Sequence, residues 1–301
     1  MREPELIEVA ERVYAYIQPD GSWYINNTGF VVGTRSVVSV DACSTQRRTE
    51  AYRAAIARTS ARPVTTLINT HHHGDHTYGN FVFDGATIVA HENCRTAVLE
   101  AGPPADRGIW DPVDWGAVVL APPTLTFTDR VRLWSDEMPI EVSYVGQAAH
   151  TDNDSLVWLP GQQVLFCGDL LFNDGTPFLL MGSVTGAIKV LTDVVARFPA
   201  RTIVPGHGAP CDRGLIATVV GYLDFVLDAA RRGRDAGLSP LDTAREIDLG
   251  EYAGWLDRER IVGNLHRAYH DLDPAGPAVS IAAALADMVA YNGGKPLTCH
   301  A

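Results

Sequence analysis

Residues 70–76 read Thr-His-His-His-Gly-Asp-His and contain the pattern His-x-His-x-Asp-His. The stretch directly follows the apolar, β-branched run PVTTLI, which predicts a buried strand. In a loop at the end of a strand, His71 and His73 can point to one side together, while Asp75 and His76 reach a second point nearby. Imidazole and carboxylate groups are ligands that suit zinc. The stretch therefore predicts a metal site at the edge of a sheet, where further ligands can gather.

Three more potential ligands end strand patterns further along the chain: His150 in AAHTDND, Asp169 in VLFCGDL and His207 in TIVPGHG. Each lies at a junction between strand and loop, where a sheet can place it along the same edge as the first four. A histidine-rich surface loop would need no such downstream set. We therefore interpret all of these residues as one metal-binding constellation.

The chain mixes strand and helix patterns up to about residue 212. A strand is predicted at Glu8–Tyr16, a hairpin from Trp23–Val32 and Ser36–Val40, and a β-α-β unit over residues 36–70. Residues 101–122 are rich in proline, glycine and aspartate, and predict a long loop of the kind that often lines a site.

From Gly214 onward the strand patterns vanish, and helical patterns follow at 214–236, 240–246, 256–271 and 278–291. No linker rich in proline, serine or glycine separates this region. We expect residues 1–212 to form an α/β (α+β) domain that carries the cluster, and residues 213–301 to form a helical extension that packs on the same domain.

Composition indicates a globular protein and disfavours several kinds of binding partner. The chain has 301 residues, 46% hydrophobic and 20% charged, which suits a globular protein with a sizeable core. Its formal net charge of −12 disfavours non-specific binding to nucleic acid or to anionic lipid. The five cysteines are widely spaced without a C-x-x-C pair, so no disulfide framework is predicted. Without a signal-peptide pattern or an apolar run of about 18 residues, we expect a cytoplasmic protein with a small-molecule substrate and neither nucleic acid nor membrane as partner.

The ligand motifs resemble the metallo-β-lactamase superfamily over about residues 8–212. The resemblance implies a four-layer αβ/βα sandwich with two metals at one end of the sheets. Carried over, it implies that the first metal is held by His71, His73 and His150, and the second by Asp75, His76 and His207.

Asp169 would bridge the two metals, as in the glyoxalase II-like and lactonase-like branches of the superfamily. Asp41, in VVSVDAC, matches the family's aspartate at a strand end near the metal loop. We expect it to hold a ligand in place rather than to bind metal.

The ligand set predicts a mechanism. Two metals about 3.5–4 Å apart hold a bridging water and lower its pKa toward neutrality. The hydroxide attacks a carbonyl, and Asp75 accepts and returns the proton. Two zinc ions are expected, and iron or manganese is chemically reasonable in such a site. We therefore predict a binuclear metallohydrolase for a thioester, lactone or lactam of small-molecule metabolism, with a slight preference for thioesters.

The substrate pocket is predicted from aromatic residues near the cluster and from one histidine of the extension: Trp23, Tyr24, Trp110, Phe178 and His266. Two other functions stay open at this point. A persulfide dioxygenase resembles the motif but binds one iron. A non-catalytic binding protein on the same fold would usually have lost ligands, and none is missing here.

Overall fold

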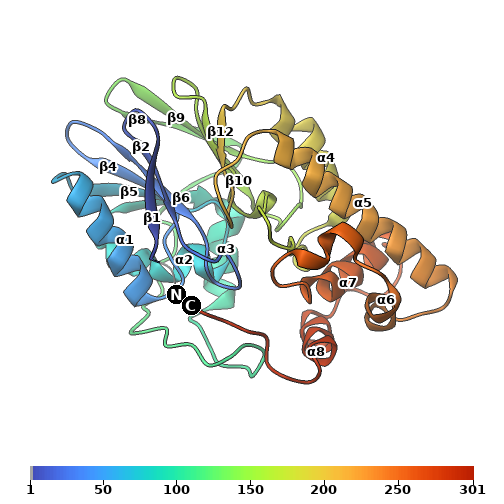
Figure 1. The fold of residues 1–301 in the computed structure, drawn as a ribbon. Coiled ribbons are helices and arrows are strands. Elements are labelled where there is room, and N and C mark those ends of the chain that lie inside the picture. Colours follow the sequence, from blue (N-terminus) through green and yellow to red (C-terminus); the bar gives the residue numbers. More distant parts are fainter. Residues whose placement is uncertain (1–2) are drawn as a thin grey trace.

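The computed structural model describes residues 3–301. Two β-sheets lie face to face in it, and helices cover their outer faces (Figure 1). The strands of the first sheet are β1 (Glu5–Ala10), β2 (Val13–Ile17), β3 (Thr28–Val32), β4 (Val37–Val40), β5 (Val64–Ile68), β6 (Thr87–His91) and β7 (Leu125–Phe127). Those of the second are β8 (Arg130–Ser135), β9 (Met138–Tyr144), β10 (Ser155–Leu159), β11 (Val164–Phe166) and β12 (Thr202–Val204).

The first sheet follows chain order from β1 to β7, and the second has the order β12-β11-β10-β9-β8. Strands β4 to β7 pair in parallel, as do β11 and β12, and the other pairs are antiparallel. The helices are α1 (Gln46–Thr59), α2 (Gly74–Thr77), α3 (Glu92–Ala101), α4 (Val184–Asp193), α5 (Gly214–Asp235), α6 (Pro240–Glu246), α7 (Arg260–Leu272) and α8 (Ile281–Tyr291).

Alternation of side chains along the strands builds the layers. On β10, Val157 and Leu159 lie in the core between the sheets, while Leu156 and Trp158 lie in the core that includes α4 and α5. This is the period of two that a strand buried on both faces requires. On the other side, Tyr52 of α1 packs in the core that covers the first sheet. The predicted four-layer sandwich is confirmed.

The helices after residue 212 pack onto the second sheet through α4, which contacts both α5 and α7. Asn264 of α7, fully buried, ties them to the segment that follows β11. Its side-chain oxygen accepts from the Leu179 N–H at 2.8 Å, and its amide donates to the Pro177 carbonyl at 2.8 Å and to the Tyr222 hydroxyl at 3.1 Å. The division into two parts at residue 212 stays a prediction. No helix of the described chain combines the length and apolarity needed to cross a membrane.

Two predicted strands are wrong in extent. The expected strand Glu8–Tyr16 is a hairpin, because Arg12 turns the chain with a φ of 62° and its N–H donates to the Glu8 carboxylate at 3.1 Å. In the second case only Thr28–Val32 of Trp23–Val32 is a strand. The residues before it instead form a loop, held in part by Asn27, whose side-chain amide donates to the carbonyls of Pro205 and Gly208 at 2.9 and 2.6 Å.

Replacing Asn264 tests the hydrogen bonds between α7 and the segment that follows β11. Asn264→Ala should lower the free energy of unfolding by about 2 kcal/mol, because it leaves the buried Leu179 N–H and Pro177 carbonyl without partners. Urea unfolding measures the change. Thr192→Ala, an exposed α4 position whose hydroxyl bonds only its own helix, is the control. Equal unfolding midpoints for the two variants would contradict the expectation.

Candidate metal centre

The predicted ligands come together at one edge of the two sheets. His71 and His73 follow β5, Asp169 follows β11 and His207 follows β12. Because β11 and β12 are parallel, with Phe166 opposite Val204, their ends leave the sheet at the same edge. The His150 loop, between β9 and β10, reaches this edge from the second sheet.

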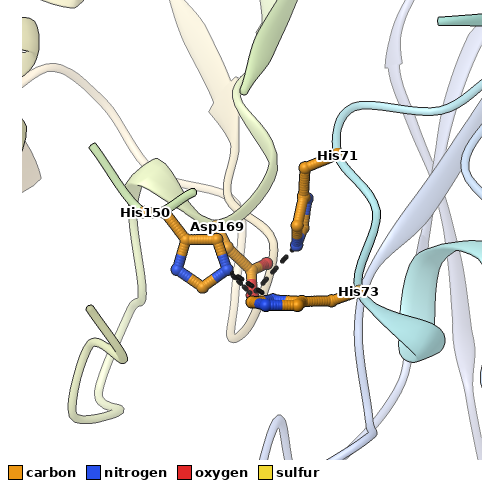
Figure 2. A group of neighbouring side chains, drawn as sticks. All are labelled: His71, His73, His150 and Asp169. Carbon is orange, nitrogen blue, oxygen red and sulfur yellow. Dashed lines mark hydrogen bonds and ion pairs between the residues drawn. The ribbon is translucent and has the colours of Figure 1, made fainter. Parts of the chain in front are cut away.

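The side chains form two overlapping groups. The first comprises His71, His73, His150 and Asp169, and the second comprises Asp75, His76, Asp169 and His207. Each group offers one ligand atom per residue, all within 4.8 Å of one another. Figure 2 shows the first group, with His71 and His73 entering from one side and His150 and Asp169 from the other. Four side chains in each group, with Asp169 shared, give the seven residues that the sequence predicted.

Asp169 lies between the two groups and close to four imidazoles. Its Oδ1 is 3.0 Å from His76 Nε2, and its Oδ2 is 3.3 Å from His150 Nε2 and 3.4 Å from His207 Nε2. His71 Nε2 lies 3.8 Å from the same Oδ2. One carboxylate that faces both groups is the arrangement a bridging ligand needs.

The outward nitrogens of four of these histidines already have partners. His76 Nδ1 bonds the Asp41 carboxylate at 2.8 Å, His150 Nδ1 bonds the Phe178 carbonyl at 2.6 Å and His207 Nδ1 bonds the Gly21 carbonyl at 3.0 Å. Such partners hold the proton on Nδ1 and leave the lone pair of Nε2 pointing inward. His71 Nδ1 likewise contacts the hydroxyl of the neighbouring threonine at 3.1 Å.

His71 Nε2 is buried without a hydrogen-bond partner, and His76 Nε2 and Asp169 Oδ1 have only each other, as an ion pair at 3.0 Å without hydrogen-bond geometry. Buried polar atoms are seldom left unpaired, and imidazole nitrogen with carboxylate oxygen is a donor set that suits zinc. His73 differs because its Nδ1 faces the group, 2.8 Å from His150 Nε2. The residues present therefore fit two metal ions.

The two groups differ electrostatically. Burial lowers the pKa of His71 and His73 well below the ordinary value, and that of His150 to about 4. For His76 and His207, burial also acts to lower the pKa, but Asp169 and the other nearby carboxylates outweigh it. They raise the pKa of His76 well above its usual range and that of His207 to about 9. Without metal, the three histidines of the first group are neutral and ready to bind, while His76 and His207 of the second hold protons that a metal must displace.

Asp41 lies where the sequence predicts a supporting residue. It follows β4 with a φ of 59°, and its two oxygens accept from the Thr70 N–H and hydroxyl, each at 2.8 Å. One of these oxygens also bonds His76 Nδ1. A non-glycine residue with this backbone is strained, and strain of this kind is kept where a side chain must be held in one place.

A cavity of about 80 Å³ opens onto the cluster. Asp75, Asp169 and His207 reach it from the cluster. Its other walls are mostly aromatic or apolar, and they include four of the five predicted pocket residues: Trp23, Tyr24, Trp110 and Phe178. Burial and the nearby Tyr78 and Asp75 raise the pKa of Tyr24 well above its usual range, so its hydroxyl keeps the proton at neutral pH.

The comparisons with known proteins agree with this geometry. Residues 21–207 match the sequence profile described as the metallo-beta-lactamase superfamily. The chain belongs to this superfamily. Relatives include a type 2 metallo-beta-lactamase of Bacteroides fragilis, 29% identical over 67% of this chain and 78% of that protein. A hydroxyacylglutathione hydrolase of Nitrosococcus oceani is 30% identical over 51% of this chain and 52% of that protein.

Among solved structures, a metallo-beta-lactamase from Pontibacter korlensis superposes with a TM-score of 0.62 at 19% identity. The superposition covers 74% of this chain and 99% of that one, and at this identity it shows the fold. Membership of the superfamily, hydrolases among its relatives and two groups of metal-binding side chains support a metal-dependent hydrolase.

His266 is the one predicted pocket residue that lies elsewhere. It faces α8, where its Nε2 bonds the Asp287 carboxylate at 2.8 Å, and it lines a different surface pocket. The face of α7 that meets the cavity instead carries Arg260, with Gly263 beside Phe178. Spacing along a helix does not indicate which face turns toward a site, so the sequence pattern could not place His266.

Arg260 was missed by sequence analysis. It is 2% exposed, its guanidinium lies 4.0 Å above the Trp23 ring, and it donates to the Thr176 carbonyl at 2.9 Å. Its charge is balanced by Asp257 at 2.8 Å. Phe172, stacked on His207 with ring centroids 4.8 Å apart, was missed as well, although its place just after Asp169 was a usable signal. An arginine that begins an amphipathic helix gives no comparable signal.

Asp41→Asn should weaken zinc binding about 10- to 100-fold, because the carboxylate that orients His76 becomes a neutral amide. Asparagine tolerates the same backbone conformation, so the fold should remain. Competition with a chromophoric chelator measures the affinity. Asp136→Asn is a close control, since Asp136 has a φ of 54° and accepts from the Thr34 N–H and hydroxyl far from the cluster. Equal affinities for both variants would remove Asp41 from this role.

Zinc binding at pH 7 should release about two protons, from His76 and His207, because a metal binds neutral imidazole. Since metal-free His207 has a pKa of about 9, zinc affinity should rise from pH 6 toward pH 9 and fall on acidification. Calorimetry in two buffers of different ionisation enthalpy counts the protons. His207→Gln should release about one fewer. Identical heats in both buffers would contradict the assigned protonation.

Proposed function

We propose that this chain is a binuclear metallohydrolase that cleaves an acyl substrate, a thioester, lactone or lactam, at a carbonyl group. The observation that carries the proposal is the pair of ligand groups that share Asp169. Zinc is the expected metal, with His71, His73 and His150 on one ion and Asp75, His76 and His207 on the other. When bound, the two ions would supply an activated water and polarise the carbonyl.

Asp75 is the side chain proposed to move the proton. Its Oδ2 lies 3.3 Å from His207 Nε2, and it lines the cavity. Burial acts to raise its pKa, but the neighbouring His76 and His207 outweigh this and lower it, so the carboxylate is ionised at neutral pH. An ionised carboxylate can accept a proton from the attacking water and return it to the leaving group.

The cavity walls support an acyl substrate with an apolar part. Trp23 contacts Trp110 and Phe178 edge to face, with ring centroids 5.4 and 5.0 Å apart, and the three form a continuous aromatic wall. We keep the slight preference for thioesters. The similarity to a hydroxyacylglutathione hydrolase supports the preference for thioesters. The similarity to type 2 metallo-beta-lactamases is the reason to test a lactam as well. A cytoplasmic protein with a small-molecule substrate remains our expectation.

The first experiment combines metal analysis with a substrate panel. Purified chain should carry about two zinc ions and hydrolyse one of an acyl-glutathione thioester, a lactone or a chromogenic cephalosporin, with the activity lost on chelation and restored by zinc. Asp169→Ala should lose both the zinc and the activity, and Asp193→Ala, an exposed position on α4, should keep both. One iron per chain without hydrolysis would favour the dioxygenase, and full metal without turnover would favour the binding protein.

A further inference from the structure

Tyr24 lies in a backbone position that rarely holds a tyrosine. Residues 22–25 form a tight turn in which the Ile25 N–H donates to the Ser22 carbonyl at 2.9 Å, and Tyr24 is its third residue, with a φ of 61°. Glycine or asparagine is usual at such a position, because other side chains meet the backbone there. A bulky residue kept in a strained turn beside a cavity points to a use for its side chain.

The Tyr24 ring packs against two tryptophans of the 101–122 loop. Trp110 and Trp115 meet it edge to face, with ring centroids 5.3 and 4.9 Å away. Edge-to-face contacts of this kind hold an aromatic ring in one orientation. The position of the ring therefore depends on how firmly the loop itself is held.

The backbone near each of the two tryptophans is hydrogen-bonded to another part of the fold. Near Trp110, the Leu297 N–H donates to the Ile109 carbonyl at 2.7 Å, and the Asp111 N–H donates to the Leu297 carbonyl at 2.9 Å. The tail that carries Leu297 runs from α8 back toward the N-terminal half of the chain (Figure 1). At Trp115, the loop is held by the start of α1, because the Gln46 N–H donates to the Trp115 carbonyl at 3.1 Å.

No hydrogen bond among the described residues involves the Tyr24 hydroxyl. Other tyrosines of the fold use theirs: the Tyr52 hydroxyl donates to the Gly29 carbonyl, and the Tyr222 hydroxyl accepts from Asn264. Tyr24 lines the same cavity as Asp75, Asp169 and His207. A tyrosine held in one orientation at the wall of this cavity, whose hydroxyl bonds no protein group, can offer that hydroxyl to a substrate oxygen.

We propose that Tyr24 is a catalytic residue whose hydroxyl donates a hydrogen bond to the oxygen of the reacting carbonyl as negative charge develops there. The proposal rests on the proposed hydrolase function and adds a donor that the metal ligands do not supply. No proton leaves Tyr24 in this role. A donor held in place before the reaction needs no reorganisation, and for this reason such donors lower barriers.

Tyr24→Phe removes the hydroxyl and keeps the aromatic ring that packs on both tryptophans, so it isolates the effect of the hydroxyl. Tyr78→Phe is the matched control: Tyr78 also meets Trp115 edge to face, at 5.6 Å, but it does not line the cavity. Zinc content and thermal midpoint should be the same in both variants and the wild type.

Two readouts test the role on zinc-loaded protein. With the best substrate of the panel, Tyr24→Phe should lower kcat about tenfold or more and leave KM within about twofold. By calorimetry it should also weaken binding of phenylacetate, a carboxylate that resembles an acyl product, while Tyr78→Phe changes neither quantity.

The outcomes separate this inference from the hydrolase proposal. Hydrolysis by the wild type with unchanged kcat in Tyr24→Phe would overturn the role of Tyr24 alone, as would a change in KM without a change in kcat. A wild type that hydrolyses nothing would overturn the hydrolase. In that case weaker phenylacetate binding by Tyr24→Phe would still support the hydroxyl as an oxygen-binding donor, and unchanged or absent binding would overturn it.

Discussion

The structure depends on the pairing of the buried Asp169 carboxylate with the imidazoles around it. A buried charge is costly unless it is paired, and here His76, His150 and His207 approach it within 3.0 to 3.4 Å. Without metal, protons on His76 and His207 balance the negative charge. Metal ions in the two groups would take over that balance, so the charges that pair within the cluster are also suited to binding cations.

The histidines of the cluster are oriented by hydrogen bonds to distant parts of the chain. Each histidine that turns its Nε2 inward needs a partner for Nδ1, and the partners come from separate segments: Asp41 after β4, Gly21 before β3 and Phe178 after β11. Asn264 of α7 in turn holds the segment around Phe178. The helical extension is thereby linked to the orientation of His150, which sheet packing alone would not require.

The cavity depends on the same long-range organisation. Tyr24 stays in its strained turn because two tryptophans hold its ring, and those tryptophans are held by the C-terminal tail and by the start of α1. Arg260 lines the same cavity, where its guanidinium lies over the Trp23 ring and pairs with the Asp257 carboxylate. Packing energy from apolar and aromatic contacts offsets the local cost of the strained backbone.

Sequence patterns are sufficient to predict the β-α-β unit over residues 36–70 and the seven residues of the cluster. These signals are local: a β-branched run ends, and a histidine or aspartate follows it at the same sheet edge. Hydrophobic pattern also predicted the helices after residue 212 within a few residues of their ends. Three features depend on tertiary contacts: Arg260 rather than His266 lines the cavity, residues 21–27 form a loop that reaches the cluster, and Tyr24 is held by segments distant in sequence. These features arise from contacts between segments far apart in the chain, and periodicity reports which face of a helix is apolar but not which neighbour it meets.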